Sequence, residues 1–184
     1  MNKSEIRNKI IKIRKNKFDK DLKINLGKFI SFLKINKLNL KSVGGYYPSN
    51  YEIDDLDILD LLEKKNFKVS LPIIKKDNQM NFYRWSRNDP LKINKFGIPE
   101  PLSSKVFYPD ILLVPLVAYD SILNRLGYGG GYYDRYIEKI EKIKKIKKVI
   151  KIGLAFSFQK ILSIPINQYD KRLDFIVTEK EILR

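Results

Sequence analysis

The chain has 184 residues, 43% of them hydrophobic and 12% aromatic, and we expect one folded domain over residues 1–184. It contains no cysteine and no histidine, which excludes disulfides, the usual zinc sites, a cysteine nucleophile and a Ser-His-Asp triad. Catalysis then has to use carboxylates, Lys, Arg, Tyr, backbone dipoles or a hard cation. Phosphoryl transfer fits this inventory because it depends on positioning and charge stabilisation.

The charge is strongly positive, with 37 basic and 21 acidic residues and a formal net charge of +16. Such a field attracts polyanions, so nucleic acid is the first partner to consider. The lysines are spread from end to end, however, which indicates a compositional bias rather than one binding stripe, and a small anionic substrate is equally compatible. No apolar run is long enough to span a bilayer and the N-terminus lacks a secretory apolar region, so we expect a cytoplasmic protein that binds no membrane.

The first third of the chain predicts two helices, a strand and a third helix. Apolar residues at near-helical spacing favour helices over residues 4–18, with Ser4 as N-cap, and over residues 22–35. Residues 42–47 read as a strand that Pro48 breaks. Acidic residues then fall in the first turns of a helix that runs to Lys65, where they are typical dipole partners: Glu52, Asp54, Asp55 and Asp57.

The next segments predict short strands and an irregular loop. Residues 67–71 form a strand that Pro72 ends, and the alternating aromatics of residues 80–85 are more typical of sheet core than of a ligand platform. Two prolines and a glycine in residues 94–101 predict a turn.

The stretch from Asp110 to Tyr136 organises the rest. An apolar run, Ile111 to Val114, predicts a buried strand closed by Pro115, and a polar turn leads into RLGYGGGYYD. A helix follows, with isoleucine every third position from 137 to 146 and an end near Lys148. Residues 149–156 predict a core strand, residues 165–170 a loop and residues 173–178 a final strand.

The glycine-rich segment has the composition of a phosphate cradle. Four glycines in five positions allow a ligand close to the backbone amides, and the start of the following helix favours an anion. Arg125 adds a forked positive charge, and Asp134 places a carboxylate where a phosphate-bound Mg²⁺ can use it. A tight turn is the purely structural alternative. The segment is not a Walker loop, because no Gly-Lys-Ser/Thr follows, and Tyr132 replaces the third glycine of the dinucleotide fingerprint.

Helical and strand patterns alternate along the chain. They predict an α/β fold in three layers, a largely parallel open sheet flanked by helices and Rossmann-like in character. The glycine-rich segment should then lie at the carboxyl edge of the sheet, the usual place for ligands in open sheets.

RLGYGGGYYDRY, preceded by PDILLVPLVAYD, resembles the signature of the 5-formyltetrahydrofolate cyclo-ligase family, or methenyltetrahydrofolate synthetases, and the likeness covers nearly the whole chain. The resemblance implies a CoA-transferase-like version of the fold. It also implies a monomer that uses MgATP to convert 5-formyltetrahydrofolate to 5,10-methenyltetrahydrofolate, ADP and phosphate. Two alternatives stay open: another ATP-dependent enzyme on the same scaffold, and a basic nucleic-acid-binding protein.

The resemblance also implies roles for single residues. KSEIR matches a Lys-x-x-Leu-Arg segment that contacts ATP, with Ile6 in place of Leu, and YYPSNYEID resembles the segment that closes over folate. The implied ATP-binding residues are Lys3, Arg7, Arg125, Gly127, Tyr128, Gly129, Gly130, Gly131, Tyr132 and Tyr133. The implied folate-binding residues are Tyr47, Glu52, Trp85, Tyr128, Gly130 and Tyr132. The implied catalytic residues are Arg125, Tyr132 and Asp134, and Asp134 with Asp170 would bind Mg²⁺.

Overall fold

The computed structural model describes residues 1–36, 40–143 and 149–184. Its helices are α1 (Lys3–Lys17), α2 (Leu26–Ile35), α3 (Leu56–Lys64), α4 (Tyr132–Ile143) and the 3₁₀ turn η1 (Ser157–Gln159). Its strands are β1 (Ser42–Gly44), β2 (Lys68–Ile74), β3 (Met80–Arg84), β4 (Leu91–Ile93), β5 (Pro99–Pro101), β6 (Val106–Phe107), β7 (Ile111–Pro115), β8 (Ala118–Tyr119), β9 (Arg125–Leu126), β10 (Ile150–Leu154), β11 (Phe175–Val177) and β12 (Ile182–Leu183).

Eight of these strands form one sheet in the order β12-β11-β10-β7-β1-β2-β3-β6. The centre is parallel: β7 pairs with β10 and β1, β1 with β2, and β10 with β11. The strands β12, β3 and β6 pair antiparallel toward the two edges. The α/β fold with a largely parallel sheet is therefore confirmed.

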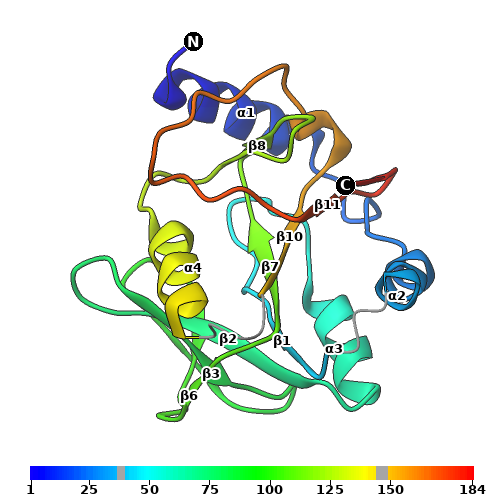
Figure 1. Cartoon of the computed structure of the whole chain (residues 1–184), viewed down its shortest axis with the longest axis vertical. Coiled ribbons are helices and arrows are strands. Elements are labelled where there is room, and N and C mark those ends of the chain that lie inside the picture. Colours follow the sequence, from blue (N-terminus) through cyan, green and yellow to red (C-terminus); the bar gives the residue numbers. More distant parts are fainter. Residues whose placement is uncertain (37–39, 144–148) are drawn as a thin grey trace.

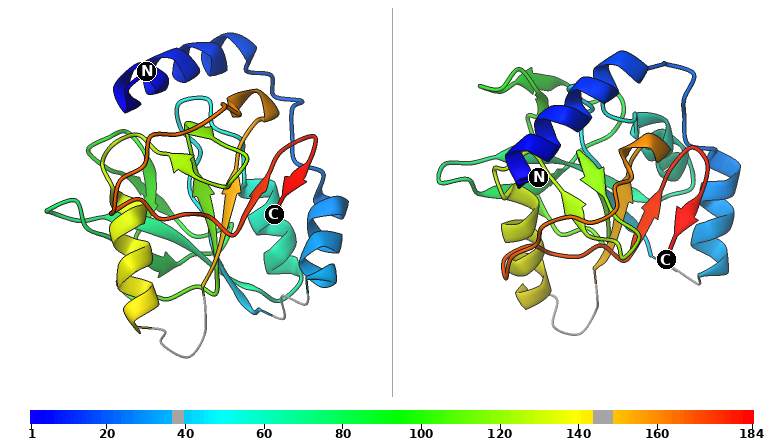
Figure 2. Two further views of the ribbon diagram at one scale, coloured as in Figure 1. Left: turned by 45° about the horizontal axis from the view of Figure 1, so that its top comes forward. Right: turned by 90° about the horizontal axis from the view of Figure 1, so that it is seen from above.

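Helices cover both faces of this sheet (Figures 1 and 2). Successive side chains of β7 point to opposite faces, so they pack against different helices. Ile111 and Leu113 join the core cluster that includes residues of α2 and α3. Leu112 and Val114 join the cluster that includes residues of α4 on the opposite face. A strand buried on both faces needs apolar residues at every position, and this explains the continuous run that the sequence shows there.

Helix α1 lies beyond the sheet, over the ends of the central strands (Figure 2). Ile6 and Ile10 pack against Val117, Ala118 and Leu126 of the short β8–β9 hairpin in a third apolar cluster. Burying an isoleucine side chain contributes about 1.5–3 kcal/mol, so these contacts hold the helix where its polar side chains face the strand ends.

The two N-terminal helices begin at different residues from those predicted. Asn2, not Ser4, is the N-cap of α1: its side chain accepts hydrogen bonds from the amides of Ser4 and Glu5. The Asn2 amide in turn donates to the Glu5 carboxylate, which completes a capping box. Helix α2 begins at Leu26 rather than residue 22, because the Asn25 side chain accepts a bond from the Lys28 amide at 2.9 Å.

Pro72 does not end its strand, which continues to Ile74 with Pro72 opposite Phe82 of β3. On the other side of β2, strand β1 ends at Gly44, which lies opposite Ser70. No hydrogen bond between β1 and β2 therefore requires the N–H that Pro72 lacks. Helix α3 starts at Leu56 with Asp55 at the N-cap position, so Glu52 and Asp54 precede the helix instead of lying in its first turns.

Other predicted loops contain short strands. Residues 94–101 were expected to be irregular, yet β4 and β5 pair around a turn at Asn94 to Ile98. The polar turn after Pro115 contains the β8–β9 hairpin, and β12 rather than β11 is the final strand. Helix α4 is described to Ile143, and the predicted continuation to Lys148 lies outside the described residues.

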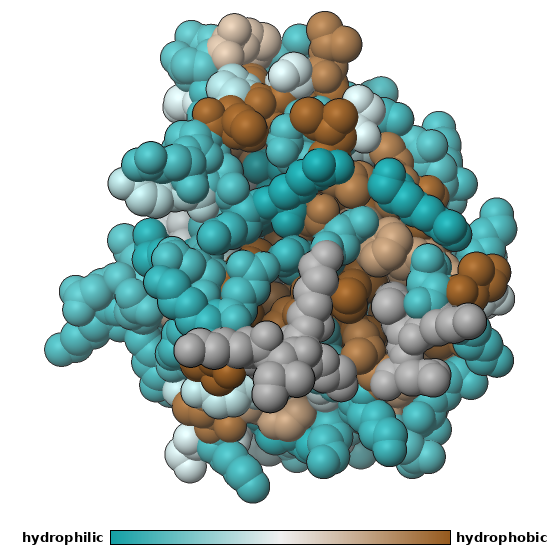
Figure 3. Space-filling model, in the orientation of Figure 1, coloured by the Kyte–Doolittle hydropathy of each residue, from teal (hydrophilic) through white to brown (hydrophobic). Residues whose placement is uncertain are grey.

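The surface in the orientation of Figure 1 is mostly hydrophilic, with apolar side chains in separate patches (Figure 3). Within residues 1–36, 40–143 and 149–184, no helix combines the length and the apolar character that a membrane span requires.

Candidate active site

The carboxyl ends of the central parallel strands define one edge of the sheet, and most of the predicted site residues lie there, whereas Trp85 bonds the start of β2. β1 and β7 end at Gly44 and Pro115, and the chain leaving β7 forms the β8–β9 hairpin that leads into residues 127–131. Helix α1 crosses the same edge (Figure 1). The predicted position of the glycine-rich segment is thus confirmed.

Backbone geometry explains why this segment is rich in glycine. Gly129 and Gly131 have φ angles of +102° and +64°, which residues with a side chain rarely adopt. A Cβ atom on Gly130 would lie 2.5 Å from Cε2 of Tyr132, and one on Gly131 would lie 2.9 Å from an Arg135 nitrogen. The loop passes directly into the first turn of α4, whose N–H groups have no partner within the helix.

Helix α1 brings two predicted cations to this loop. Nε of Arg7 donates to the carbonyl of Gly127 at 2.7 Å, and its guanidinium carbon is 3.4 Å from where a Cβ of Gly129 would lie. Nζ of Lys3 lies 2.5 Å from Oδ2 of Asp170. Both side chains are therefore within the candidate site, and Lys3 joins it to the segment before β11.

Arg125 occupies a buried position and its guanidinium binds protein groups. It donates to Oδ1 of Asp134 at 2.7 Å and to the carbonyl of Lys171. The Lys171 amide donates to the same Oδ1 atom at 2.9 Å. In this arrangement Arg125 orients Asp134 and ties it to the neighbourhood of Asp170, whereas the sequence suggested a direct phosphate contact.

The donor set around Asp134 suits a phosphate-bound Mg²⁺ better than a metal held by protein alone. Asp134 and Asp170 are carboxylates, each with a side chain about a quarter exposed. Among the described residues there is no group of three or more His, Cys, Asp or Glu residues able to hold a metal. Mg²⁺ commonly takes one or two carboxylates and completes its shell with phosphate oxygens and water, so the two aspartates fit it in that role.

Glu52 is the acid on the other side of the site. It is 7% exposed and accepts bonds from the amide of Ser49 at 2.8 Å and from its hydroxyl at 3.2 Å. Burial raises the pKa of Glu52, and the Ser49 amide, the charge of Arg14 and the Tyr128 hydroxyl oppose that rise. The result is a buried carboxyl group whose charge depends on its neighbours.

The predicted aromatic residues lie in three environments. Tyr128 is exposed, while its hydroxyl accepts a bond from Arg14. Tyr132 is partly buried and donates to Oδ1 of Asn78 at 3.2 Å. Tyr133 faces inward, with its ring 6.4 Å from that of Phe82, so its side chain points away from a ligand on the loop.

Tyr47 and Trp85 differ in their access to such a ligand. Tyr47 is partly buried in the same segment as Glu52. Trp85 is 5% exposed within the core cluster on the α2–α3 face, and Nε1 has no hydrogen-bond partner among the described residues. Both remain predicted folate contacts.

Sequence reasoning missed three residues of the site. Arg135 donates to the carbonyls of Gly130 and Asn78, the latter at 3.1 Å, and lies over the Tyr132 ring. Arg14 is 1% exposed, and Asp55 is fully buried with Oδ2 bound to the Tyr46 amide at 3.0 Å. Arg14 follows Arg7 by seven positions and so lies on the same helix face, which was the available signal.

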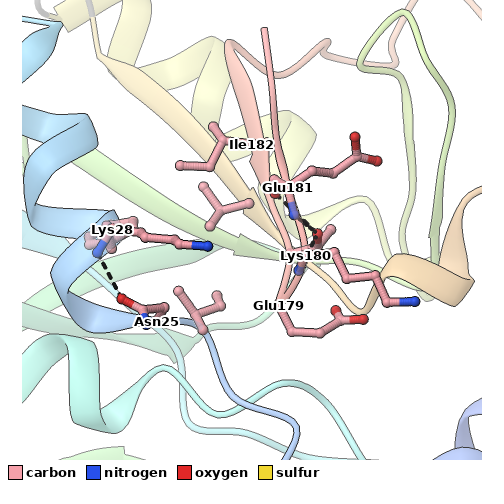
Figure 4. A pocket seen from close by; sticks show the side chains of 10 residues that line it. Asn25, Lys28, Glu179, Lys180, Glu181 and Ile182 are labelled. Carbon is pink, nitrogen blue, oxygen red and sulfur yellow. Dashed lines mark hydrogen bonds between the residues drawn. The ribbon is translucent and has the colours of Figure 1, made fainter.

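A separate hollow of about 110 Å³ lies between α2 and the β11–β12 turn (Figure 4). Its lining includes Lys28, Glu179, Glu181 and Ile182, none of which was predicted as a site residue.

Known proteins resemble this chain over most of its length. The family model described as the 5-formyltetrahydrofolate cyclo-ligase family matches residues 1–179 of this chain. A 5-formyltetrahydrofolate cyclo-ligase of Haemophilus influenzae is 34% identical over 143 residues, 74% of each chain. The NMR structure of Aquifex aeolicus 5,10-methenyltetrahydrofolate synthetase is 33% identical, has a TM-score of 0.77 and covers all of this chain and 93% of its own. A Mycoplasma pneumoniae 5,10-methenyltetrahydrofolate synthetase is 26% identical with a TM-score of 0.70, covering 98% of this chain and 100% of its own.

Proposed function

The chain belongs to the 5-formyltetrahydrofolate cyclo-ligase family, and from this premise we propose that it uses ATP to cyclise 5-formyltetrahydrofolate to 5,10-methenyltetrahydrofolate. The observation that carries the proposal is the joining of two sets of residues at one sheet edge. One set is a glycine loop with positive φ angles between arginines, and the other is a buried glutamate. The first suits a triphosphate and the second suits the N–H groups of a pterin.

The proposed reaction has two steps. The formyl oxygen of 5-formyltetrahydrofolate attacks the γ-phosphorus of ATP, ADP leaves, and the oxygen becomes part of a phosphate ester. N10 then attacks the formyl carbon and loses its proton, and the C–O bond breaks with release of phosphate. Phosphorylation is necessary because a formamide oxygen is a poor leaving group.

Each part of the candidate site has a proposed task in these steps. Amides of Gly129 to Gly131 and the start of α4 bind the phosphates, while Lys3, Arg7 and Arg135 neutralise their charge. Arg125 acts through Asp134, which it orients by the 2.7 Å ion pair. Glu52 accepts hydrogen bonds from the pterin, with Tyr47 and Tyr128 as its aromatic neighbours.

Asp134 and Asp170 are the residues that would hold Mg²⁺. When bound to the triphosphate, the ion supplies positive charge that stabilises the charge developing on the phosphate oxygens. The remaining tasks belong to the protein: α1 and the glycine loop align the γ-phosphate, and the Glu52 segment aligns the formyl group.

Incubation of the purified protein with MgATP and 5-formyltetrahydrofolate tests the proposal directly. We expect the absorbance of the methenyl product to rise, with one ADP and one phosphate for each product molecule. Product formation without ATP would contradict the ATP dependence. Turnover of ATP with other acceptors only would favour a different enzyme on this scaffold. Oligonucleotide binding whose affinity falls steeply with added salt, with no turnover, would favour the nucleic-acid alternative.

Asp134→Asn tests the carboxylate of the candidate site. Asparagine keeps an oxygen for Arg125 but loses the charge, so we expect kcat to fall about a hundredfold or more, with the fold intact by circular dichroism. Asp60→Asn is the matched control, since Asp60 forms an ion pair with Lys64 on α3, outside the site. Turnover of Asp134→Asn close to that of the wild type would remove Asp134 from the proposal.

A further inference from the structure

Arg14 connects α1 to the glycine loop from inside the protein. It is 1% exposed, donates to the carbonyl of Leu116 at 3.3 Å and to the hydroxyl of Tyr128, and has its guanidinium carbon 5.5 Å from the centre of the Tyr128 ring. Nε of Arg14 has no hydrogen-bond partner among the described residues. The groups that Arg14 contacts in these bonds are neutral, whereas a buried guanidinium is costly unless an anion is near.

The charge of Arg14 acts on the buried carboxyl group of Glu52 and lowers its pKa. Arg14 and Tyr128 both act on Glu52, and Tyr128 is the hydroxyl that Arg14 contacts, so the three side chains form one chain from α1 through the loop to the β1–α3 segment. Other groups face the same space: Tyr46 after β1, Tyr133 of α4 and Asp55. Arg14 is the cation that acts on Glu52, and Arg125 is a second cation that acts on Tyr133.

We infer that Arg14 is a positioning residue that keeps Glu52 ionised for the pterin and couples the folate half of the site to the helix that binds ATP. The inference rests on the proposed function. Arg14, Arg7 and Lys3 belong to one helix, so seating α1 against the loop places the phosphate-binding cations and the partner of Glu52 in a single step. Arg14 itself touches neither the pterin nor a phosphate in this scheme.

The sign of the pH dependence follows from the charges. Burial raises the pKa of Glu52 and the positive charge of Arg14 lowers it, so removing that charge should raise the pKa further and extend the protonated form to higher pH. A protonated carboxyl group donates one hydrogen and is a poorer acceptor for a pterin N–H. Raising the pH should ionise Glu52 again and restore binding.

The experiment measures KM for 5-formyltetrahydrofolate as a function of pH in Arg14→Gln and Arg14→Lys. Glutamine keeps an amide donor without the charge, so KM should rise about tenfold at neutral pH and return toward the wild-type value at higher pH. KM for ATP should change less. Lysine keeps the charge and should keep the wild-type pH profile. A pH-independent loss in Arg14→Gln, or the same profile in both variants, overturns the inference.

A double mutant separates coupling through Glu52 from a general packing effect. In a Glu52→Gln background no carboxyl group titrates at position 52, so adding Arg14→Gln should raise KM little further and add no pH dependence to that of Glu52→Gln. Fully additive effects overturn the inference. If Arg14→Gln fails to fold, Tyr128→Phe replaces it, because phenylalanine keeps the ring and removes the hydroxyl. KM for 5-formyltetrahydrofolate should again rise at neutral pH and recover at higher pH. An unchanged dependence of KM on pH would contradict the inference. Absence of turnover in the wild-type protein would instead count against the proposed function.

Discussion

Gly131 and Gly97 share a backbone conformation but not a neighbourhood. Their φ angles are +64° and +76°, both in the left-handed region. A Cβ on Gly131 would meet Arg135 at 2.9 Å, whereas a Cβ on Gly97 would have nothing within 4 Å. The two positions therefore allow backbone strain to be separated from displacement of Arg135.

We expect Gly131→Ala and Gly97→Ala each to lower the free energy of unfolding by about 1 kcal/mol, because alanine resists this conformation. Gly131→Ala should also raise KM for ATP, since Arg135 must move, while Gly97→Ala should leave it unchanged. Urea unfolding and steady-state kinetics measure the two effects. Equal KM values for ATP in both variants would argue against a phosphate-binding role of this loop.

Arg125 illustrates what a residue in a motif does not disclose. An arginine before a glycine cluster predicts a phosphate ligand from chemistry alone. In the folded chain its guanidinium is buried and binds Asp134 and the carbonyl of Lys171. Lys171 is 46 positions away in the sequence. The identity of the residue was therefore informative, but its partner was set by how distant segments pack.

At the scale of elements, α1 is the helix on which the candidate site most depends. Its inner face carries Ile6 and Ile10, which anchor it, together with Arg7 and Arg14, which reach the glycine loop. The order of its first turn should then control the affinity for ATP. The capping box formed by Asn2 and Glu5 gives a means of testing this.

Asn2→Ala should destabilise the protein by about 1 kcal/mol and raise KM for ATP, because the cap that orders the turn next to Lys3 is lost. Ser4→Ala is the matched control: Ser4 is exposed and its side chain does not cap the helix, so neither quantity should change. Thermal unfolding and ATP titrations distinguish the two residues. If Ser4→Ala destabilised the protein more than Asn2→Ala, Ser4 would be the N-cap, as the sequence predicted.

At the scale of the whole molecule, stability should depend on a carboxyl group that the fold buries. Asp55 is fully buried, with Oδ1 unpaired among the described residues, and burial raises its pKa well above the ordinary value. The folded chain therefore holds the Asp55 proton more tightly than the unfolded chain does. The stability that this proton contributes is complete below the unfolded pKa of about 4 and is lost as the pH rises toward the folded pKa.

Asp55→Asn removes this titration while keeping an acceptor for the Tyr46 amide. We expect the free energy of unfolding of Asp55→Asn, relative to that of the wild type, to increase as the pH rises. Urea denaturation at a series of pH values measures this difference. Asp54→Asn, at the exposed neighbouring position, is the control. A constant difference between wild type and Asp55→Asn across the pH range would show that Asp55 does not bind a proton more tightly in the folded chain.

The sequence alone determined the class of fold, the family and the place of the glycine loop. Continuous apolar strands, isoleucine-patterned helices and RLGYGGGYYDRY are local patterns, and the backbone responds to them locally. It missed Arg14, Arg135 and Asp55, and it misplaced the N-cap of α1 and the end of β2 at Pro72. The N-cap is local, because Asn2 and Glu5 are three positions apart, whereas the arginines have partners far away in the chain: Arg14 contacts Leu116 and Tyr128, and Arg135 contacts Asn78. Only tertiary packing decides which buried charge faces which carboxylate, because that pairing is a property of space and not of sequence order.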